Sequence, residues 1–146
     1  MNDLKNTETF KNLKVAFLNE SGLSHSLLFF SRIAEIEGHD HAVDFFKNLA
    51  EYAICNSHGN LDFIRNVDDP IDGSAPIGDT KKNLEAVISQ QEKEAEDTYA
   101  NFAFIAHQEG YHDIASWFET MASFKKAYLK KTKKLYSKIK KNGELQ

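Results

Sequence analysis

The stretch Ile114-Ala-Ser-Trp-Phe-Glu-Thr-Met-Ala-Ser-Phe-Lys-Lys-Ala-Tyr128 decides the fold. Large apolar residues recur in it at steps of three and four, the period of an amphipathic helix with one face toward a core. The stripe consists of Ile114, Trp117, Phe118, Met121, Lys125, Tyr128, Thr132, Leu135 and Ile139. Lys125 lies in the middle of this stripe, and burying its charge is costly without a partner. We therefore expect another part of the chain to supply that partner.

Three further segments have the same period. Together with the first, they predict helices over 7–37, 40–67, 80–109 and 111–141. Residues 68–79 hold both prolines of the chain and are predicted to be a loop. Gly38 and Gly110 should end the first and third helices. The sequence thus predicts an all-α protein made of two helical hairpins.

Composition narrows the class of protein. The chain has 146 residues, two prolines, seven glycines and 27% charged residues, which suits one helical domain over 1–146. The single cysteine, Cys55, excludes an internal disulfide and a four-cysteine metal site. The sequence shows no apolar run of transmembrane length and no signal-peptide pattern. We therefore expect a cytoplasmic protein with no membrane partner.

Charge is spread unevenly along the chain. Residues 1–124 carry 9 Lys+Arg and 21 Asp+Glu, a net charge of −12, whereas residues 125–146 carry 9 Lys and one Glu, a net charge of +8. Such asymmetry can indicate an anionic partner. The lysines, however, lack interleaved aromatic residues on one exposed face. We interpret them as a solvated face of the last helix, where cations suit the helix dipole, and we do not expect nucleic acid as a partner.

The two halves of the chain repeat each other. Gly38 corresponds to Gly110 at an offset of 72, whereas Leu13 corresponds to Leu84 at an offset of 71. The third helix therefore carries one extra residue, between about Gln91 and Phe102. An extra residue inside a helix is usually absorbed as a π-bulge, and such bulges favour functional sites.

Polar residues interrupt the apolar stripes at corresponding mid-helix positions. Four helices arranged as two fused hairpins should form a bundle in which these positions meet at the centre. The paired positions are Glu20 with Gln91, Ala53 with Lys125, and Asn56 with Tyr128.

Collinear segments over nearly the full chain carry a family resemblance. They are Asn12-Leu-Lys, Phe17-Leu-Asn-Glu20, Ala50-Glu51, His58-Gly59, Leu61-Asp-Phe-Ile64, Asp69-Pro70, Pro76-Ile-Gly78, Ile88-Ser89, Tyr99-Ala-Asn-Phe102, Glu109-Gly-Tyr111 and Trp117-Phe-Glu-Thr120. In them the chain resembles the rubrerythrins of the ferritin-like superfamily, and its loop resembles that of the short, sulerythrin-type members. The resemblance implies a single ferritin-like four-helix domain without a rubredoxin domain.

The resemblance also implies where a functional site would lie. The family holds two iron ions with a Glu on the first helix, Glu-x-x-His on the second, Glu-x-x-Glu on the third and Glu-x-x-His on the fourth. Carried over, the first ligand is kept as Glu20, and the three later motifs read Ala53-x-x-Asn56, Gln91-x-x-Glu94 and Lys125-x-x-Tyr128. Five of the seven ligands are therefore replaced. Tyr99 matches a tyrosine that the family places beside the site, whereas Leu27 replaces its counterpart on the first helix.

The replacements are consistent in charge. Relative to the family, three carboxylates are lost and one ammonium is gained. We infer that Lys125 takes the electrostatic role of the metals by bridging Glu20 and Glu94; the other reading is that Lys125 extends to solvent at the end of the bundle. Hydrogen bonds would satisfy the remaining lone pairs. The expected central polar cluster is Glu20, Asn56, Gln91, Glu94, Tyr99, Lys125 and Tyr128, with Glu20 and Glu94 as residual family ligands and no firmly identified catalytic residue.

Two functions are consistent with this cluster, and the sequence leaves open whether the protein is an enzyme. The first is a binding or scaffold protein, or a relative with altered chemistry, that has no di-iron site and no cofactor. The alternative is an oxidoreductase of the family's peroxide-reducing type, acting in oxidative stress. It would use a rearranged centre with a single iron or other divalent metal and an external electron donor. A nucleophilic Lys125 is disfavoured, because neighbouring carboxylates stabilise its protonated form.

The loop predicts the oligomeric state. The helix over 40–67 would be roughly 40 Å long, and the linker 68–79 reaches at most ~40–43 Å when fully extended. Pro70, Gly73 and Gly78 favour turns that shorten this reach. We therefore expect a homodimer, with helix pairs exchanged between chains. Glu20 of one chain would then meet Glu94 and Lys125 of the other.

Histidines outside the family positions offer a weaker signal. His39, His41, His107 and His112 lie near the two expected hairpin turns. They could bind a metal ion at the surface, but turn and cap positions explain them without one. Cys55 and His58 do not predict a zinc site, because the second helix offers no further pair of ligands.

Overall fold

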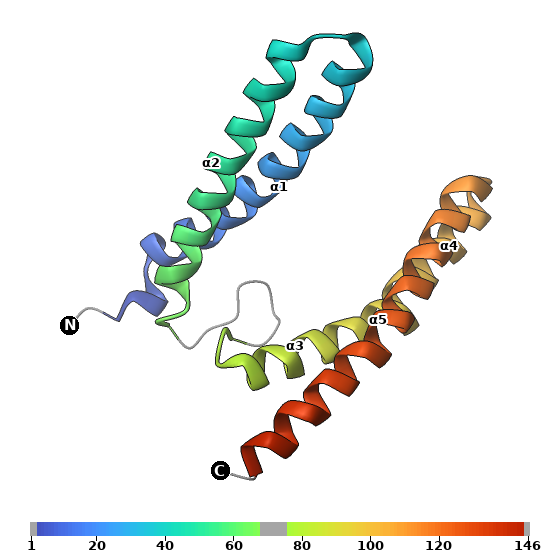
Figure 1. Ribbon diagram of the computed structural model, residues 1–146. Coiled ribbons are helices and arrows are strands. Elements are labelled where there is room, and N and C mark those ends of the chain that lie inside the picture. Colours follow the sequence, from blue (N-terminus) through green and yellow to red (C-terminus); the bar gives the residue numbers. More distant parts are fainter. Residues whose placement is uncertain (1–2, 68–75, 145–146) are drawn as a thin grey trace. The chain divides into compact units, whose positions relative to one another are not determined.

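The computed structural model describes residues 3–67 and 76–144, and every regular element within them is a helix. The chain divides between residues 72 and 73 into two compact units, each containing one helical hairpin (Figure 1). The all-α fold class predicted from the sequence is thereby confirmed. Most of the predicted loop 68–79 lies outside the described residues, and its part from 76 to 79 is not helical.

The first hairpin contains two long helices. It consists of η1 (Leu4–Asn6), α1 (Glu8–Glu37) and α2 (Asp40–Ile64). The prediction for α1 is right to within one residue, whereas α2 ends three residues before the predicted 67. After Ile64 the backbone turns more tightly, and the N–H of Val67 donates to the carbonyl of Ile64 at 3.0 Å, three residues back instead of four.

The second hairpin contains a helix in three parts and a longer returning helix. The parts α3 (Thr80–Lys93), η2 (Glu94–Thr98) and α4 (Tyr99–Gln108) follow one another without a break, and α5 (His112–Glu144) packs along them. The helix α5 extends three residues beyond the predicted 141. The element η2 is π-helical and lies in the interval where the repeat placed an extra residue. The predicted π-bulge is therefore confirmed.

Both hairpin turns are built in the same way. Gly38 and Gly110 have φ angles of 79° and 85°, in the left-handed region that glycine adopts without steric cost. In each turn the next residue donates its N–H to a carbonyl five residues back, which is the Schellman motif. These bonds run from His39 to Ala34 (2.9 Å) and from Tyr111 to Ala106 (2.8 Å).

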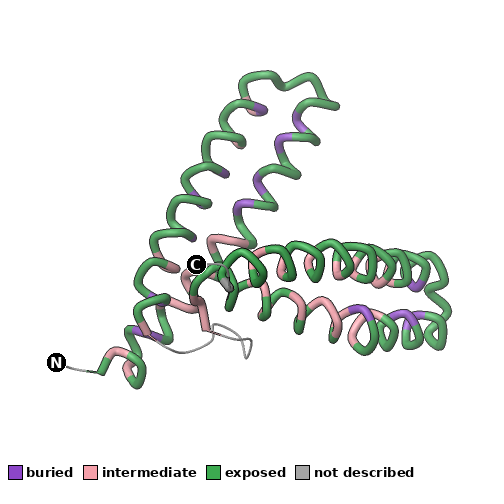
Figure 2. Tube along the Cα trace, turned by 60° about the horizontal axis from the view of Figure 1, so that its bottom comes forward, coloured by how far each residue is buried: buried purple, intermediate pink, exposed green. Residues whose placement is uncertain are grey.

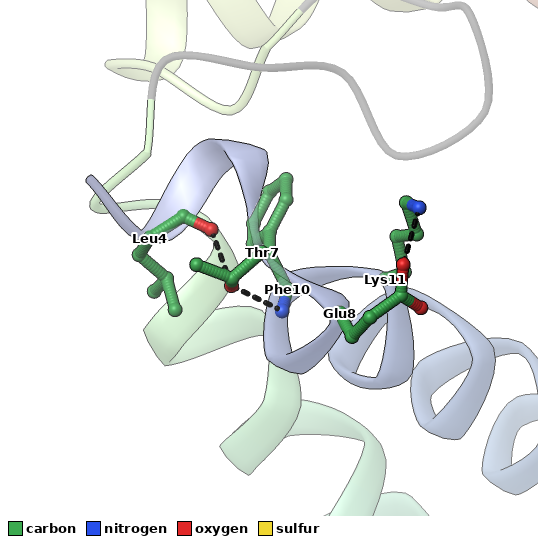
Figure 3. Close-up of polar contacts among 5 residues, drawn as sticks. All are labelled: Leu4, Thr7, Glu8, Phe10 and Lys11. Carbon is green, nitrogen blue, oxygen red and sulfur yellow. Dashed lines mark hydrogen bonds and ion pairs between the residues drawn. The ribbon is translucent and has the colours of Figure 1, made fainter. Parts of the chain in front are cut away.

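The first turn of α1 is held by side chains. The hydroxyl oxygen of Thr7 accepts a hydrogen bond from the N–H of Phe10 at 3.1 Å, and the same hydroxyl donates to the carbonyl of Leu4 at 2.8 Å (Figure 3). Lys11 pairs with Glu8 at 2.6 Å on the same turn. Such a cap satisfies a backbone amide that the helix itself leaves unbonded.

Small residues fill the contact between α1 and α2. Leu27, Ala50 and Ala53 form its core cluster, and the hydroxyl oxygens of Ser21 and Ser57 lie 2.8 Å apart across the contact. Figure 2 shows the buried positions recurring along both helices of the hairpin. Residues without large side chains allow two helix backbones to approach each other, as Ala50, Ala53, Ser21 and Ser57 do here.

Each hairpin also leaves large apolar side chains exposed. Phe63 in α2 is 61% exposed, and Trp117 in α5, a member of the stripe predicted to face a core, is 58% exposed. A helical hairpin buries only the faces that its two helices turn toward each other. Its remaining apolar face needs a further layer of protein.

The turn glycines yield a stability prediction. We expect Gly38→Ala and Gly110→Ala each to lower the free energy of unfolding by roughly 1–2 kcal/mol, because a Cβ is unfavourable in the left-handed region. Urea unfolding followed by circular dichroism measures the change.

The matched control is Gly22→Ala in the middle of α1, where an added Cβ meets no atom within 4 Å. Alanine should stabilise that position by about 0.5–1 kcal/mol, since it restricts the unfolded chain. Equal effects at all three positions would show that backbone conformation does not determine stability at the turns.

Candidate functional site

Lys125 meets Glu94 within the second hairpin. Its Nζ lies 2.6 Å from Oε2 of Glu94, and the two side chains are 35% and 17% exposed. The second carboxylate oxygen, Oε1, accepts a hydrogen bond from Nε2 of Gln90 at 2.8 Å. Oε1 of the half-buried carboxylate is therefore hydrogen-bonded, whereas Oε2 is a buried atom that lies in the ion pair with Lys125 and has no hydrogen bond of regular geometry among the described residues.

The π-helical segment positions this carboxylate. Glu94 is the first residue of η2, and its backbone carbonyl accepts from the N–H of Tyr99, five residues on. The wider turn shifts the register of the side chains that follow by one residue relative to an uninterrupted α-helix. As a result, α3 and α4 can both present apolar residues to α5 while Glu94 faces Lys125.

The environment of Glu94 acts on its pKa in two directions. Burial raises the pKa, whereas the hydrogen bonds from Lys125 and Gln90 and the charge of Lys125 lower it. The net effect is a pKa below the ordinary value of 4.5. Glu94 is thus an anion at neutral pH, and its pairing stabilises the folded hairpin at pH values above its ordinary pKa of 4.5.

Two further contacts join α3 to α5. Lys133 pairs with Glu92 at 2.6 Å, and the hydroxyl of Tyr136 donates to Oε1 of Glu85 at 2.5 Å. That bond raises the pKa of Tyr136. Sequence reasoning missed both contacts, although a signal was present: in an antiparallel hairpin, partners lie about equally far from the turn. Glu85 and Tyr136 are 25 and 26 residues from Gly110.

The first hairpin contributes a separate and weaker polar contact. Nδ2 of Asn56 donates to Oε2 of Glu20 at 3.5 Å, the long limit of a hydrogen bond. Ala53, at a family ligand position, is 2% exposed in the core between α1 and α2. The predicted bridge from Glu20 to Lys125 would connect residues of two different units, and it stays a prediction.

The remaining residues of the predicted cluster lie in different surroundings. Oε1 of Gln91 is buried and has no hydrogen-bond partner among the described residues. The ring of Tyr99 stacks on Phe118 with centroids 6.4 Å apart. Tyr128 is 57% exposed, and the ammonium of Lys131 lies 5.0 Å from its ring centre.

The described part of the chain contains neither a cluster of metal-binding side chains nor a membrane span. Across residues 3–67 and 76–144, no three His, Cys, Asp or Glu side chains form a group that could hold a metal ion. None of the helices in this part of the chain is both long and apolar enough to cross a bilayer.

The two ion pairs between the same helices allow a matched prediction. A double-mutant cycle of Lys125→Met and Glu94→Gln should give a coupling on the order of 1–3 kcal/mol, because the pair is partly desolvated. The cycle of Lys133→Met and Glu92→Gln should give about 0.2–1 kcal/mol, because that pair is more exposed. Chemical unfolding at pH 7 measures both.

The pH dependence provides the control. The folded-state pKa of Glu94 is lowered, so its stabilising effect is present above pH 4.5 and is lost as the pH falls through the lowered pKa. The coupling between Lys125 and Glu94 should therefore vanish in strong acid. A coupling no larger than that of the exposed pair at pH 7 would contradict the structural interpretation.

Known proteins of one family are similar to this chain, although no protein-family model matches it. It is 32% identical over 149 residues to rubrerythrin-1 of Clostridium acetobutylicum, covering 97% of this chain and 76% of that protein. It is 31% identical to the rubrerythrins of Porphyromonas gingivalis and Nitratidesulfovibrio vulgaris, covering 82% and 84% of this chain. The chain spans 61% and 65% of these two relatives, less than two thirds of their length. With this identity over nearly its whole length, the chain belongs to the rubrerythrin family.

Proposed function

We propose that this protein is a rubrerythrin homologue in which a salt-bridged polar cluster replaces the di-iron site, and that it works as a binding or scaffold protein. The observation that carries the proposal is the ion pair of Lys125 with Glu94 at 2.6 Å. A fixed cation thereby lies against a carboxylate that the family resemblance assigns to iron.

The donor set does not fit two iron ions. Oε2 of Glu94 is occupied by an ammonium, which has no lone pair to offer a metal. Ala53 is a buried apolar residue without a donor, and Asn56 and Gln91 are neutral. Glu20 and Glu94 carry two negative charges, and Lys125 already offsets one. Two divalent ions would therefore be left largely uncompensated in charge.

A second candidate function has one observation in its favour. Oε1 of Gln91 is a buried acceptor without a partner among the described residues, one helical turn before Glu94. Together with Glu20 and Glu94 it would provide three oxygen ligands for one divalent ion. An altered peroxide-reducing oxidoreductase, supplied by an external electron donor, would need such a single-metal centre.

Metal content distinguishes the two functions. The chain, purified from cells grown with added iron, should contain far less than one iron or manganese per chain by elemental analysis. Restoring the family ligands by Ala53→Glu, Asn56→His, Gln91→Glu, Lys125→Glu and Tyr128→His should raise the content toward two. One iron or manganese per wild-type chain that is lost on Glu20→Gln/Glu94→Gln would support the second candidate, and two would contradict the proposal.

We further propose that the two hairpins build one four-helix domain and that the protein is a homodimer with exchanged hairpins. The exposed apolar faces of α2 and α5, including Phe63 and Trp117, support this proposal because a second hairpin would cover them. The charge pattern is compatible: the Glu20–Asn56 contact of one hairpin offers a carboxylate, and the other hairpin carries Lys125.

Light scattering should give twice the mass of one chain. With Cys55→Ser as the background, the pair Glu20→Cys and Lys125→Cys should oxidise to a disulfide that joins two chains. A monomeric mass would contradict the dimer, and a disulfide within one chain would contradict the exchange. Failure to form either disulfide would contradict the central contact itself.

A further inference from the structure

Two histidine nitrogens face each other at the turn of the second hairpin. His107 lies in the last turn of α4, and His112 is the first residue of α5. Their Nδ1 atoms are 3.0 Å apart, and their ring centres are 5.3 Å apart. The His107 side chain is 42% exposed, so solvent ions can reach the pair.

A carboxylate sets the tautomer of His107. Glu119 lies about two helical turns after His112 in α5. Its Oε1 is 3.0 Å from Nε2 of His107. An ionised carboxylate only accepts hydrogen bonds, so Nε2 carries the proton and donates it. In the neutral ring Nδ1 then keeps its lone pair, and that lone pair is directed at the Nδ1 of His112.

The spacing of the two nitrogens suits a metal ion. Imidazole nitrogens bind divalent transition metals at ~2.0–2.1 Å. Two nitrogens 3.0 Å apart would then subtend about 90–97° at the metal, given those bond lengths. That angle belongs to neighbouring ligands in tetragonal coordination, the geometry of nickel(II) and copper(II). Binding requires that neutral His112 carry its proton on Nε2 instead of Nδ1, and that the two rings turn so that both Nδ1 lone pairs converge on the metal.

We propose that His107 and His112 form a surface binding site for one divalent transition-metal ion of the nickel type, with Glu119 as the residue that orients His107. Water completes the coordination, since the two imidazoles are its protein ligands. A carboxylate on the far nitrogen of a metal-binding histidine fixes the ring and makes it a better ligand. This site is separate from the cluster around Lys125 and does not depend on the proposed function.

The internal repeat supplies a natural comparison. At the offset of 72, the first hairpin has Glu35, Asp40 and Lys47 in place of the two histidines and Glu119. Its own turn histidines, His39 and His41, are not arranged as a facing pair: His39 lies 3.8 Å from Glu37. The triad therefore belongs to the second hairpin and not to the general design of the turn.

The experiment titrates Ni²⁺ into the full-length chain without a histidine tag, using a coloured chelator as competitor. The wild type and the matched control His39→Ala/His41→Ala should bind one Ni²⁺ per chain with equal affinity. His107→Ala and His112→Ala should each abolish this site. Glu119→Ala should weaken binding roughly 10–100-fold, and Glu119→Gln, which keeps an acceptor oxygen, should weaken it less.

Several outcomes would overturn the proposal. One is that the wild type does not bind Ni²⁺. Another is that the double variant His107→Ala/His112→Ala binds Ni²⁺ with wild-type affinity. Binding lost only on Glu20→Gln/Glu94→Gln would place the metal in the central cluster and would equally overturn it. Circular dichroism of each variant shows whether the helices are intact, and Glu119→Gln provides a test that changes neither ligand.

Discussion

The ammonium of Lys125 constrains the structure more than any other single group. It interrupts an apolar stripe at a position where its side chain is 35% exposed, and leaving its charge unpaired there would be unfavourable. Its partner, Glu94, lies on the opposite arm of the hairpin and at the start of the π-helical segment. The turn at Gly110 and the wider turn of η2 together bring this carboxylate to the lysine. A feature that looks like a local irregularity of one helix thus supports the packing of two.

The two hairpins hold their helices together through different kinds of side chain. Between α1 and α2, alanines and serines let the backbones approach, and buried hydroxyl groups such as Ser57 find hydrogen bonds within the contact. Between α3 and α5, ion pairs and the bond from Tyr136 to Glu85 bridge a more polar contact. The repeated Schellman turns show that the hairpins share a design, while the contacts between their helices differ in polarity.

Family membership is shown by the comparisons, whereas the difference in site chemistry is our proposal. The likeness to rubrerythrins extends over nearly the whole chain. The chemistry of a metal centre depends on a few side chains, which can change while the scaffold persists. The pairing of Lys125 with Glu94 is the observation on which the proposed difference from its relatives rests.

Much of the architecture follows from the sequence alone, because it depends on local rules. Helix period, glycine C-caps and the offset of the repeat are read within short windows, and they predicted the hairpins, the turns at Gly38 and Gly110, and the π-bulge. The end of α2 at Ile64 was missed, because the apolar pattern continues past the point where the backbone turns. The sequence also indicated that Lys125 needs a partner, and the family resemblance, not the period of one helix, predicted Glu94 and Glu20 for that role.

Only the tertiary structure decided the contacts between helix arms. The choice of Glu94 as the partner of Lys125 depends on the register of α5 against a helix that contains a π-helical turn. The facing nitrogens of His107 and His112 depend on the Schellman turn that reverses the chain between them. Sequence spacing placed these histidines near a turn but gave no direction to their rings. Side-chain direction across a turn follows from backbone geometry, and residue spacing in the sequence does not specify that geometry.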